Sequence, residues 1–257
     1  MLEVAGLTKE YFRRPVVSQV SFAIHAGEVL GYLGPNGSGK STTVKMITGL
    51  LEPTHGQVFF HGHNINSDLP GYKRCYGYVP EEPHVYPYLT GREYLLLVGR
   101  LRCLPERVLG ERIDELLRLF GLEPDRHAPM SSYSKGMRQK VLICGALLHD
   151  PELLVFDEPL AGLDVTTALV LRDLVSTLAR RGKIILYSSH VLETVEKICS
   201  RVIILKQGRV AADGHVTQLR DLMPDRRSDG ACPAAESTWN ILPPECAQHG
   251  SRVLYSQ

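Results

Sequence analysis

Eight consecutive residues near the start of the chain have the types and spacing to bind a chain of phosphates. Residues 34–41 read Gly-Pro-Asn-Gly-Ser-Gly-Lys-Ser and match the pattern G-x-x-x-x-G-K-[ST]. An apolar run at residues 29–33 predicts a buried strand before them, and residues 42–50 predict a helix after them. A glycine-rich loop between strand and helix directs backbone N–H groups and the positive end of the helix dipole at one point. The alternative is a glycine-rich turn that matches the pattern by chance.

The residues of this loop divide phosphate binding between backbone and side chains. We expect Lys40 to reach the β- and γ-phosphates and to support catalysis, and Ser41 to be a ligand of Mg²⁺. The glycines allow backbone N–H groups to turn inward around the phosphates. The expected binding set is Gly34, Pro35, Asn36, Gly37, Ser38, Gly39, Lys40, Ser41 and Thr42.

Two adjacent carboxylates end a second apolar run. Residues 153–156 read Leu-Leu-Val-Phe, and Asp157 and Glu158 follow them. P-loop ATPases hold a magnesium aspartate and a catalytic carboxylate at the tip of a strand beside the phosphate loop. We therefore predict Asp157 as a Mg²⁺ ligand and Glu158 as the base or water-orienting group for attack on the γ-phosphate. The alternative is an ordinary strand that ends in a solvated acidic turn.

The elements that must position these residues are typical of an α/β protein. Short alternating segments at residues 2–4, 20–24 and 58–60 predict an antiparallel N-terminal sheet. Later strand and helix patterns alternate, which predicts a parallel sheet. The expected helices of the middle of the chain cover residues 94–104, 106–120 and 135–149. The later elements are expected at residues 153–156, 166–181, 184–187, 192–199 and 202–205.

We thus expect a P-loop NTPase core with a parallel sheet, an N-terminal antiparallel β subdomain and an inserted helical subdomain. The predicted domain covers residues 1–222, with the helical subdomain at about residues 83–150. Residues 223–257 are rich in Pro, Ser, Gly and charged residues and predict a poorly ordered tail.

The composition argues against several classes of function. Of 257 residues, 44% are hydrophobic and 22% are charged, which is an ordinary balance for a globular protein. The net charge of +1 gives no strong field toward nucleic acid, so no nucleic-acid partner is expected. The six cysteines include no CxxC pair, which argues against a zinc site or a disulfide framework. No apolar run approaches the roughly 18 residues of a membrane span. Work at a membrane would therefore need another polypeptide.

A resemblance to a known family rests first on residues 133–139, Tyr-Ser-Lys-Gly-Met-Arg-Gln. They resemble the signature motif of the nucleotide-binding subunits of ABC transporters, and they precede the acidic strand as in that family. Residues 161–164, Ala-Gly-Leu-Asp, resemble the D-loop, and His190 after Ser188-Ser189 resembles the switch histidine. Tyr11 stands where the family has an aromatic ring that stacks on adenine. The resemblance covers about residues 1–222.

The resemblance implies that two subunits bind and hydrolyse ATP with Mg²⁺ between them. Ser134 and Gly136 would contact the ATP held by the partner subunit, and His190 would sense the γ-phosphate. Each of these has a purely structural alternative: Ser134 as a helix cap, His190 as a structural histidine, and Tyr11 as a half-buried tyrosine at a strand end. The implied partners are a second nucleotide-binding subunit, in a homodimer or heterodimer, and a transmembrane permease subunit. The implied location is the cytoplasmic face of the cell membrane.

Two positions depart from the commonest family pattern. Glu81 replaces the glutamine of the Q-loop; it keeps a carbonyl-type oxygen, adds a negative charge and loses an amide donor. Our hypothesis is that Glu81 keeps the metal-linked role of that loop. Lys135 stands where many members have glycine, and it either adds positive charge near the partner's ATP or faces water. With Pro-Glu-Glu at residues 80–82, the Ser-Lys-Gly form resembles bacterial export-type, ABC-2-like subunits.

The leading interpretation is an ATP-binding and ATP-hydrolysing subunit that powers transport through a separate membrane subunit, with export as the expected direction. The alternative is a soluble ABC-type ATPase of the translation or repair kind. Translation-type members usually carry two such domains in one chain, and repair-type members insert a long coiled coil where this chain predicts short helices. The sequence leaves open the transported substrate, the direction of transport and the function of the tail.

Overall fold

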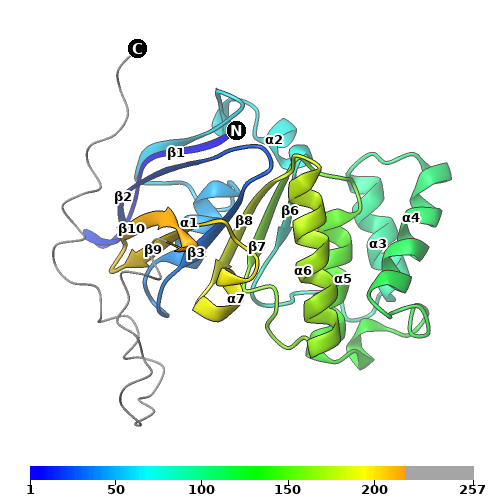
Figure 1. Ribbon diagram of the computed structural model, residues 1–257. Coiled ribbons are helices and arrows are strands. Elements are labelled where there is room, and N and C mark those ends of the chain that lie inside the picture. Colours follow the sequence, from blue (N-terminus) through cyan, green and yellow to red (C-terminus); the bar gives the residue numbers. More distant parts are fainter. Residues whose placement is uncertain (218–257) are drawn as a thin grey trace, which may run out of the picture.

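The computed structural model describes residues 1–217, and its strands form two β-sheets (Figure 1). The predicted tail at residues 223–257 and the last five residues of the predicted domain lie outside the described residues. The smaller sheet is antiparallel and has four strands. Its spatial order is β2 (Arg14–Ile24), β1 (Leu2–Tyr11), β4 (His55–Phe60) and β5 (His63–Asn64). The predicted N-terminal antiparallel sheet is thus confirmed, although β1 and β2 are longer than the sequence pattern indicated.

The larger sheet has six strands and contains the element that leads into the phosphate loop. Its spatial order is β10 (Arg209–His215), β9 (Arg201–Lys206), β3 (Val29–Leu33), β8 (Ile184–Ser189), β7 (Leu153–Asp157) and β6 (Tyr76–Val79). Five strands are parallel, and β10 pairs antiparallel with β9 at one edge. The sheet is therefore mixed rather than wholly parallel. Every residue of β3 and β7 is buried, which is why both appear in the sequence as continuous apolar runs.

Seven helices of the described chain connect these strands. They are α1 (Lys40–Ile47), α2 (Leu69–Cys75), α3 (Gly91–Leu101), α4 (Glu106–Leu119), α5 (Lys135–Leu147), α6 (Val165–Arg180) and α7 (Leu192–Glu196). Single 3₁₀ turns occur at Ile65–Ser67 and Met130–Ser132. A capping box begins α3: Glu93 N donates to Thr90 Oγ1 at 3.1 Å, and Thr90 N donates to Glu93 Oε2 at 2.9 Å.

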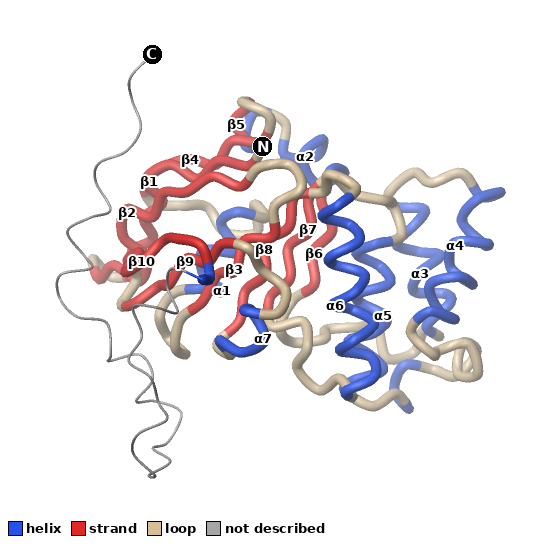
Figure 2. Tube along the Cα trace, in the orientation of Figure 1, coloured by secondary structure: helices blue, strands red, loops and turns tan. Residues whose placement is uncertain are grey.

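Helices α3, α4 and α5 form a group beside the edge strand β6 (Figure 2). Their buried leucines and isoleucines belong to the same hydrophobic cluster as the side chains on one face of β7 and β8. Examples are Leu95, Ile113 and Leu117, which are fully buried. The helical group is thus packed onto the sheet and fixes the start of α5 near the carboxyl ends of the strands. Among residues 1–217 no helix combines the length and apolar character that a membrane span requires.

Candidate nucleotide site

The phosphate loop joins β3 to α1, and its glycines are required by the backbone. Gly39 adopts φ +103° as the N-cap of α1, where Thr43 N donates to its carbonyl at 2.9 Å. A Cβ at Gly39 would lie 2.8 Å from the carbonyl oxygen of Val16, and one at Gly34 would lie 2.5 Å from that of Leu205. Because both contacts involve backbone, no side chain fits at either position. The loop therefore passes closer to the backbone of Val16 and Leu205 than residues with side chains would allow.

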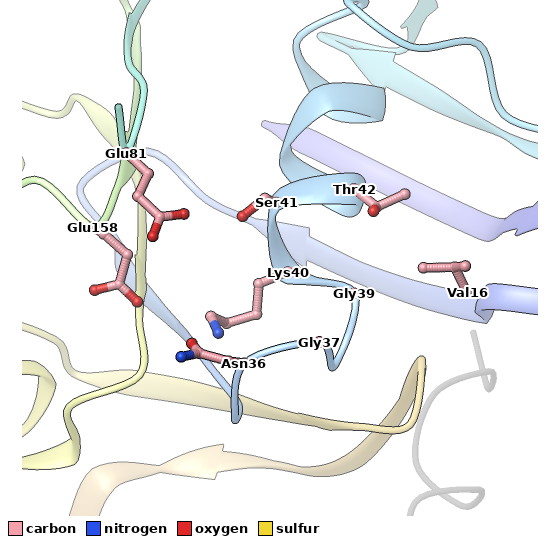
Figure 3. A pocket seen from close by; sticks show the side chains of 9 residues that line it. All are labelled: Val16, Asn36, Gly37, Gly39, Lys40, Ser41, Thr42, Glu81 and Glu158. Atoms are coloured by element: carbon pink, nitrogen blue, oxygen red, sulfur yellow. The ribbon is translucent and has the colours of Figure 1, made fainter. Parts of the chain in front are cut away.

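A cavity of about 340 Å³ lies over this loop (Figure 3). It brings together the loop and two carboxylates from distant parts of the chain: Glu81 follows β6, and Glu158 follows β7. Figure 3 shows the side chain of Lys40 extending from α1 toward the side on which these carboxylates lie. The lining residues are Val16, Asn36, Gly37, Gly39, Lys40, Ser41, Thr42, Glu81 and Glu158.

The ammonium group of Lys40 is buried between the loop and the carboxylates. Its Nζ donates to the carbonyl oxygen of Gly34 at 2.7 Å and to that of Pro35 at 3.2 Å. Burial lowers the pKa of Lys40, and the negative charges of Glu158, Asp157 and Glu81 oppose that shift. Three carboxylates thus favour the charged form of this one lysine. A bound triphosphate would add further negative charge, so the site favours a ligand that enters with a cation.

The carboxylate of Asp157 is suited to hold that cation. The residue is 2% exposed, and its Oδ1 has no hydrogen-bond partner among the described residues. Burial raises the pKa of Asp157, although the hydroxyls of Ser188 and Ser41 act in the opposite direction. A buried carboxylate oxygen without a partner, beside a serine hydroxyl, fits a hard cation that takes oxygen ligands. Among residues 1–217 no group of three or more His, Cys, Asp or Glu side chains is placed to hold a metal ion.

Glu158 and His190 meet at the carboxyl ends of β7 and β8. Glu158 Oε1 lies 2.7 Å from His190 Nδ1, and Glu158 Oε2 accepts from Ser189 Oγ at 3.1 Å. The backbone of Glu158 has φ +48°, and its N–H donates to the carbonyl of Ser188 at 3.0 Å. A left-handed glutamate is unfavourable, and such strained residues cluster at functional sites. The carboxylate is thus oriented by two partners and faces the cavity.

Half of the predicted site residues do not line the cavity: Tyr11, Gly34, Pro35, Ser38, Ser134, Gly136, Asp157 and His190. Ser134 Oγ accepts from Met137 N at 3.1 Å and so caps α5, as the sequence indicated. Neither Ser134 nor Gly136 lines the cavity; Gly136 instead abuts the backbone of Gly162. Tyr11, at the end of β1, is 44% exposed and also does not line the cavity. One chain therefore brings most of the loop together with Glu81 and Glu158 but leaves Ser134 and Gly136 outside that cavity.

Val16 is a lining residue that the sequence reasoning missed. It lies on β2 and contributes an aliphatic surface beside the loop. A valine in a strand has no side-chain chemistry that would mark it as a binding residue in the sequence. Its place beside the loop becomes visible only in the folded structure.

Comparison with known families, proteins and solved structures gives matches that all point to ATP-binding subunits of ABC transporters. The sequence model of the family described as ABC transporter matches residues 17–161, from β2 to the turn after Glu158. The ABC-type transporter ATP-binding protein EcsA of Bacillus subtilis (strain 168) is 37% identical over 221 residues, 86% of this chain and 90% of EcsA. The Nod factor export ATP-binding protein I of Rhizobium meliloti (strain 1021) is 36% identical over 220 residues, 86% of this chain and 66% of that protein. A dimeric ATP-binding cassette, solved in a post-hydrolysis state with ADP and Pi, is similar with a TM-score of 0.78 at 26% identity, over 84% of this chain and 99% of that one.

Proposed function

This chain belongs to the ABC transporter family as an ATP-binding subunit with ATPase activity, and we propose that it drives export by closing and reopening a dimer around two ATP molecules. The proposal rests on one observation: the residues predicted to contact ATP lie in two separate places in a single chain. The cavity is lined by most of the phosphate loop together with Glu81 and Glu158, whereas Ser134 and Gly136 lie outside it. A second subunit would supply the missing half.

Within the chain, the loop and Lys40 bind the phosphates of ATP. Lys40 exchanges its bonds to the carbonyls of Gly34 and Pro35 for phosphate oxygens, which accept the same protons with a full negative charge. Val16 offers an apolar contact to the nucleoside, and the exposed ring of Tyr11 is the proposed stacking partner of adenine. Binding thus requires no large rearrangement of the cavity.

Three oxygen-bearing side chains are the proposed holders of Mg²⁺: Ser41, Asp157 and Glu81. When bound, Mg²⁺ neutralises charge on the β- and γ-phosphate oxygens. The orphaned Oδ1 of Asp157 supports this assignment, and Glu81 faces the same cavity. The extra charge of Glu81, relative to glutamine, would strengthen the attraction for the cation.

Glu158 is the proposed base, or water-orienting group, for attack on the γ-phosphate. Its carboxylate is held by Ser189 and His190 and lines the cavity on the side toward which Lys40 extends. His190 would then donate to the γ-phosphate or the attacking water and so distinguish ATP from ADP. The short contact between the two side chains supports their action as one unit.

The start of α5 is the proposed contact with the partner's ATP. Ser134 caps a helix of 13 residues, and a capped helix N-terminus is a site for anions. The dimeric cassette with ADP and Pi supports a dimeric arrangement for this chain as well. We propose that hydrolysis removes the phosphate between the two halves and lets them separate.

A transmembrane permease subunit is the proposed second partner, which would place this chain at the cytoplasmic face of the cell membrane. Tyr86 and Tyr88 are large exposed side chains in the segment between β6 and α3 and are suited to protein contact. The relative named for Nod factor export supports the outward direction. Co-purification of a membrane protein with the full chain tests this partner, and recovery only of chains that lack membrane spans would contradict it.

The experiment that tests the catalytic assignment compares two glutamates that flank β7. Replacing the base in Glu158→Gln should slow ATP hydrolysis by about 10²- to 10⁴-fold and trap ATP-bound dimers in gel filtration. Glu152→Gln is the matched control, because Glu152 also pairs with a histidine, His61, at 2.9 Å but lies at the other end of the strand. It should hydrolyse ATP at the rate of the unaltered chain. Wild-type hydrolysis by Glu158→Gln would remove Glu158 from its proposed role.

A further inference from the structure

Strands β1 and β2 form a hairpin whose turn lies close to a residue of the nucleotide cavity. Tyr11 pairs with Arg14 across the end of the hairpin, so only Phe12 and Arg13 form the turn. Both turn residues have positive φ, 51° and 62°, as the tightest two-residue hairpin turns require. Val16, two positions after Arg14, lines the cavity. The turn thus fixes the backbone of Tyr11 near the cavity wall.

The ring of Tyr11 is held by a second residue of the same strand. The residue is 44% exposed, so packing against the sheet leaves much of the side chain uncovered. Lys9 Nζ lies over the ring, 5.6 Å from its centroid, which is within the range of a cation–π interaction. An aromatic ring has two faces, and the ammonium group covers one of them.

Lys9 is itself anchored to the backbone. Its Nζ donates to the carbonyl oxygen of Glu52 at 2.7 Å, in the segment between α1 and β4. The same segment is bonded to β1 on both sides of Lys9: Thr54 N donates to the carbonyl of Thr8 at 2.8 Å, and Glu10 N donates to Thr54 Oγ1 at 3.1 Å. The ammonium group over the tyrosine ring therefore has a defined position.

We propose that Lys9 is a positioning residue for the base of the nucleotide. It holds the ring of Tyr11 in one orientation and leaves the opposite face to adenine. A ring that is already ordered loses less conformational freedom when the base stacks on it, so the nucleotide binds more tightly. This inference rests on the proposed function, in which Tyr11 stacks on adenine.

A lysine also attracts phosphates through its charge alone, and that attraction depends neither on the base nor on Tyr11. The base and the phosphates can be tested separately, because ADP carries both and inorganic triphosphate carries only phosphates. A double-mutant cycle between Lys9 and Tyr11 then shows whether the lysine acts through the ring.

The experiment measures the Kd of ADP and of inorganic triphosphate by isothermal titration calorimetry, with Mg²⁺ and the full chain. Lys9→Met should weaken ADP binding by roughly 2- to 10-fold and leave triphosphate binding unchanged. In a chain that already carries Tyr11→Ala, Lys9→Met should have no further effect on ADP binding. In assays of ATP hydrolysis, Lys9→Met should raise KM and leave kcat unchanged, because the base takes no part in the transfer of the γ-phosphate.

Two further variants serve as controls. Lys9→Arg should retain most of the ADP affinity, because a guanidinium group also lies over aromatic rings and donates hydrogen bonds. Lys183→Met is the matched control: Lys183 Nζ likewise donates to a backbone carbonyl, that of Asp150, at 3.0 Å, but both residues precede β8 and β7 at the amino ends of these strands. It should leave the affinities for ADP and triphosphate unchanged.

Equal weakening of ADP and triphosphate binding in Lys9→Met would overturn the inference, as would an undiminished effect of Lys9→Met in the presence of Tyr11→Ala. Unchanged ADP binding in Lys9→Met, together with weakened binding in Tyr11→Ala, would overturn the inference and leave the stacking role of Tyr11 in place. Unchanged ADP binding in Tyr11→Ala would refute that stacking role, and the inference with it.

Discussion

Ser134 has two predicted contributions, and substitutions at this position separate them. The structural one is the cap of α5, in which Met137 N donates to Ser134 Oγ at 3.1 Å. Loss of such a cap in Ser134→Ala lowers the free energy of unfolding by about 1 kcal/mol, whereas Ser134→Gly lowers it by only about a few tenths of a kcal/mol. For a domain of this size, 1 kcal/mol lowers the melting temperature by about 2–4 °C. A purely structural serine would therefore produce a small loss of stability and nothing more.

The functional contribution is much larger, because the proposed acceptor is a charged phosphate. A hydrogen bond to a charged group contributes about 1.5–3 kcal/mol, equivalent to about 10- to 150-fold in an equilibrium constant. A symmetric dimer contains two such contacts, so Ser134→Ala should weaken ATP-driven dimerisation by about 10²- to 10⁴-fold. Ser134→Asp should keep the cap, since aspartate caps as well as serine, but it places a negative charge against the partner's phosphate. We expect this variant to unfold at the temperature of the unaltered chain and to form no dimer with ATP.

Thr90→Ala is the matched control, because Thr90 caps α3 through Glu93 N at the same distance of 3.1 Å but does not line the nucleotide cavity. Melting temperatures by differential scanning calorimetry and ATP-dependent dimerisation by analytical ultracentrifugation give the two readouts. Thr90→Ala and Ser134→Ala should lose similar stability, and only the second should lose dimerisation. Dimerisation of Ser134→Asp at the level of the unaltered chain would refute the reasoning, and so would an equal loss in Thr90→Ala.

Two further predictions concern charge inside the protein. Glu81→Gln removes one negative charge from the wall of the nucleotide cavity, so the affinity for Mn²⁺, a probe for Mg²⁺, should weaken by roughly 10- to 100-fold when measured by electron paramagnetic resonance with ATP present. The neighbouring Glu82→Gln should leave the Mn²⁺ affinity unchanged. An unchanged Mn²⁺ affinity in Glu81→Gln would exclude a metal-linked role for Glu81. Burial, together with the charge of Arg102, lowers the pKa of His149 to about 4, so between pH 6.5 and 4 the unfolded chain binds a proton that the folded chain does not. As the pH falls through that range, the free energy of unfolding of the unaltered chain should therefore decrease relative to that of His149→Gln, measured by urea titration. A difference between the two chains that does not change with pH would contradict the lowered pKa of His149.

The sequence predicted the fold well where local patterns carry the information. The run at residues 153–156 is apolar throughout because both faces of β7 are buried, and Thr90 with Glu93 marks the start of α3 three residues before the expected start at residue 94. Strand β10 was missed because it lies at a sheet edge and none of its residues is buried, which removes the apolar pattern. Helix α2 was missed because it has only seven residues and one buried side chain, Tyr72. The family assignment is confirmed by the match over residues 17–161.

The parts of the candidate site that lie within one sequence motif could be predicted. The contacts between residues that are distant in the sequence could not. The phosphate loop and the pair Asp157 and Glu158 are local, and the cavity contains Glu158 together with most of the loop. The 2.7 Å contact of Glu158 with His190 depends on the pairing of β7 with β8, which no local pattern encodes. Val16 enters the cavity for the same reason, through the course of β2 past the loop. The roles of these residues in binding and catalysis stay predictions.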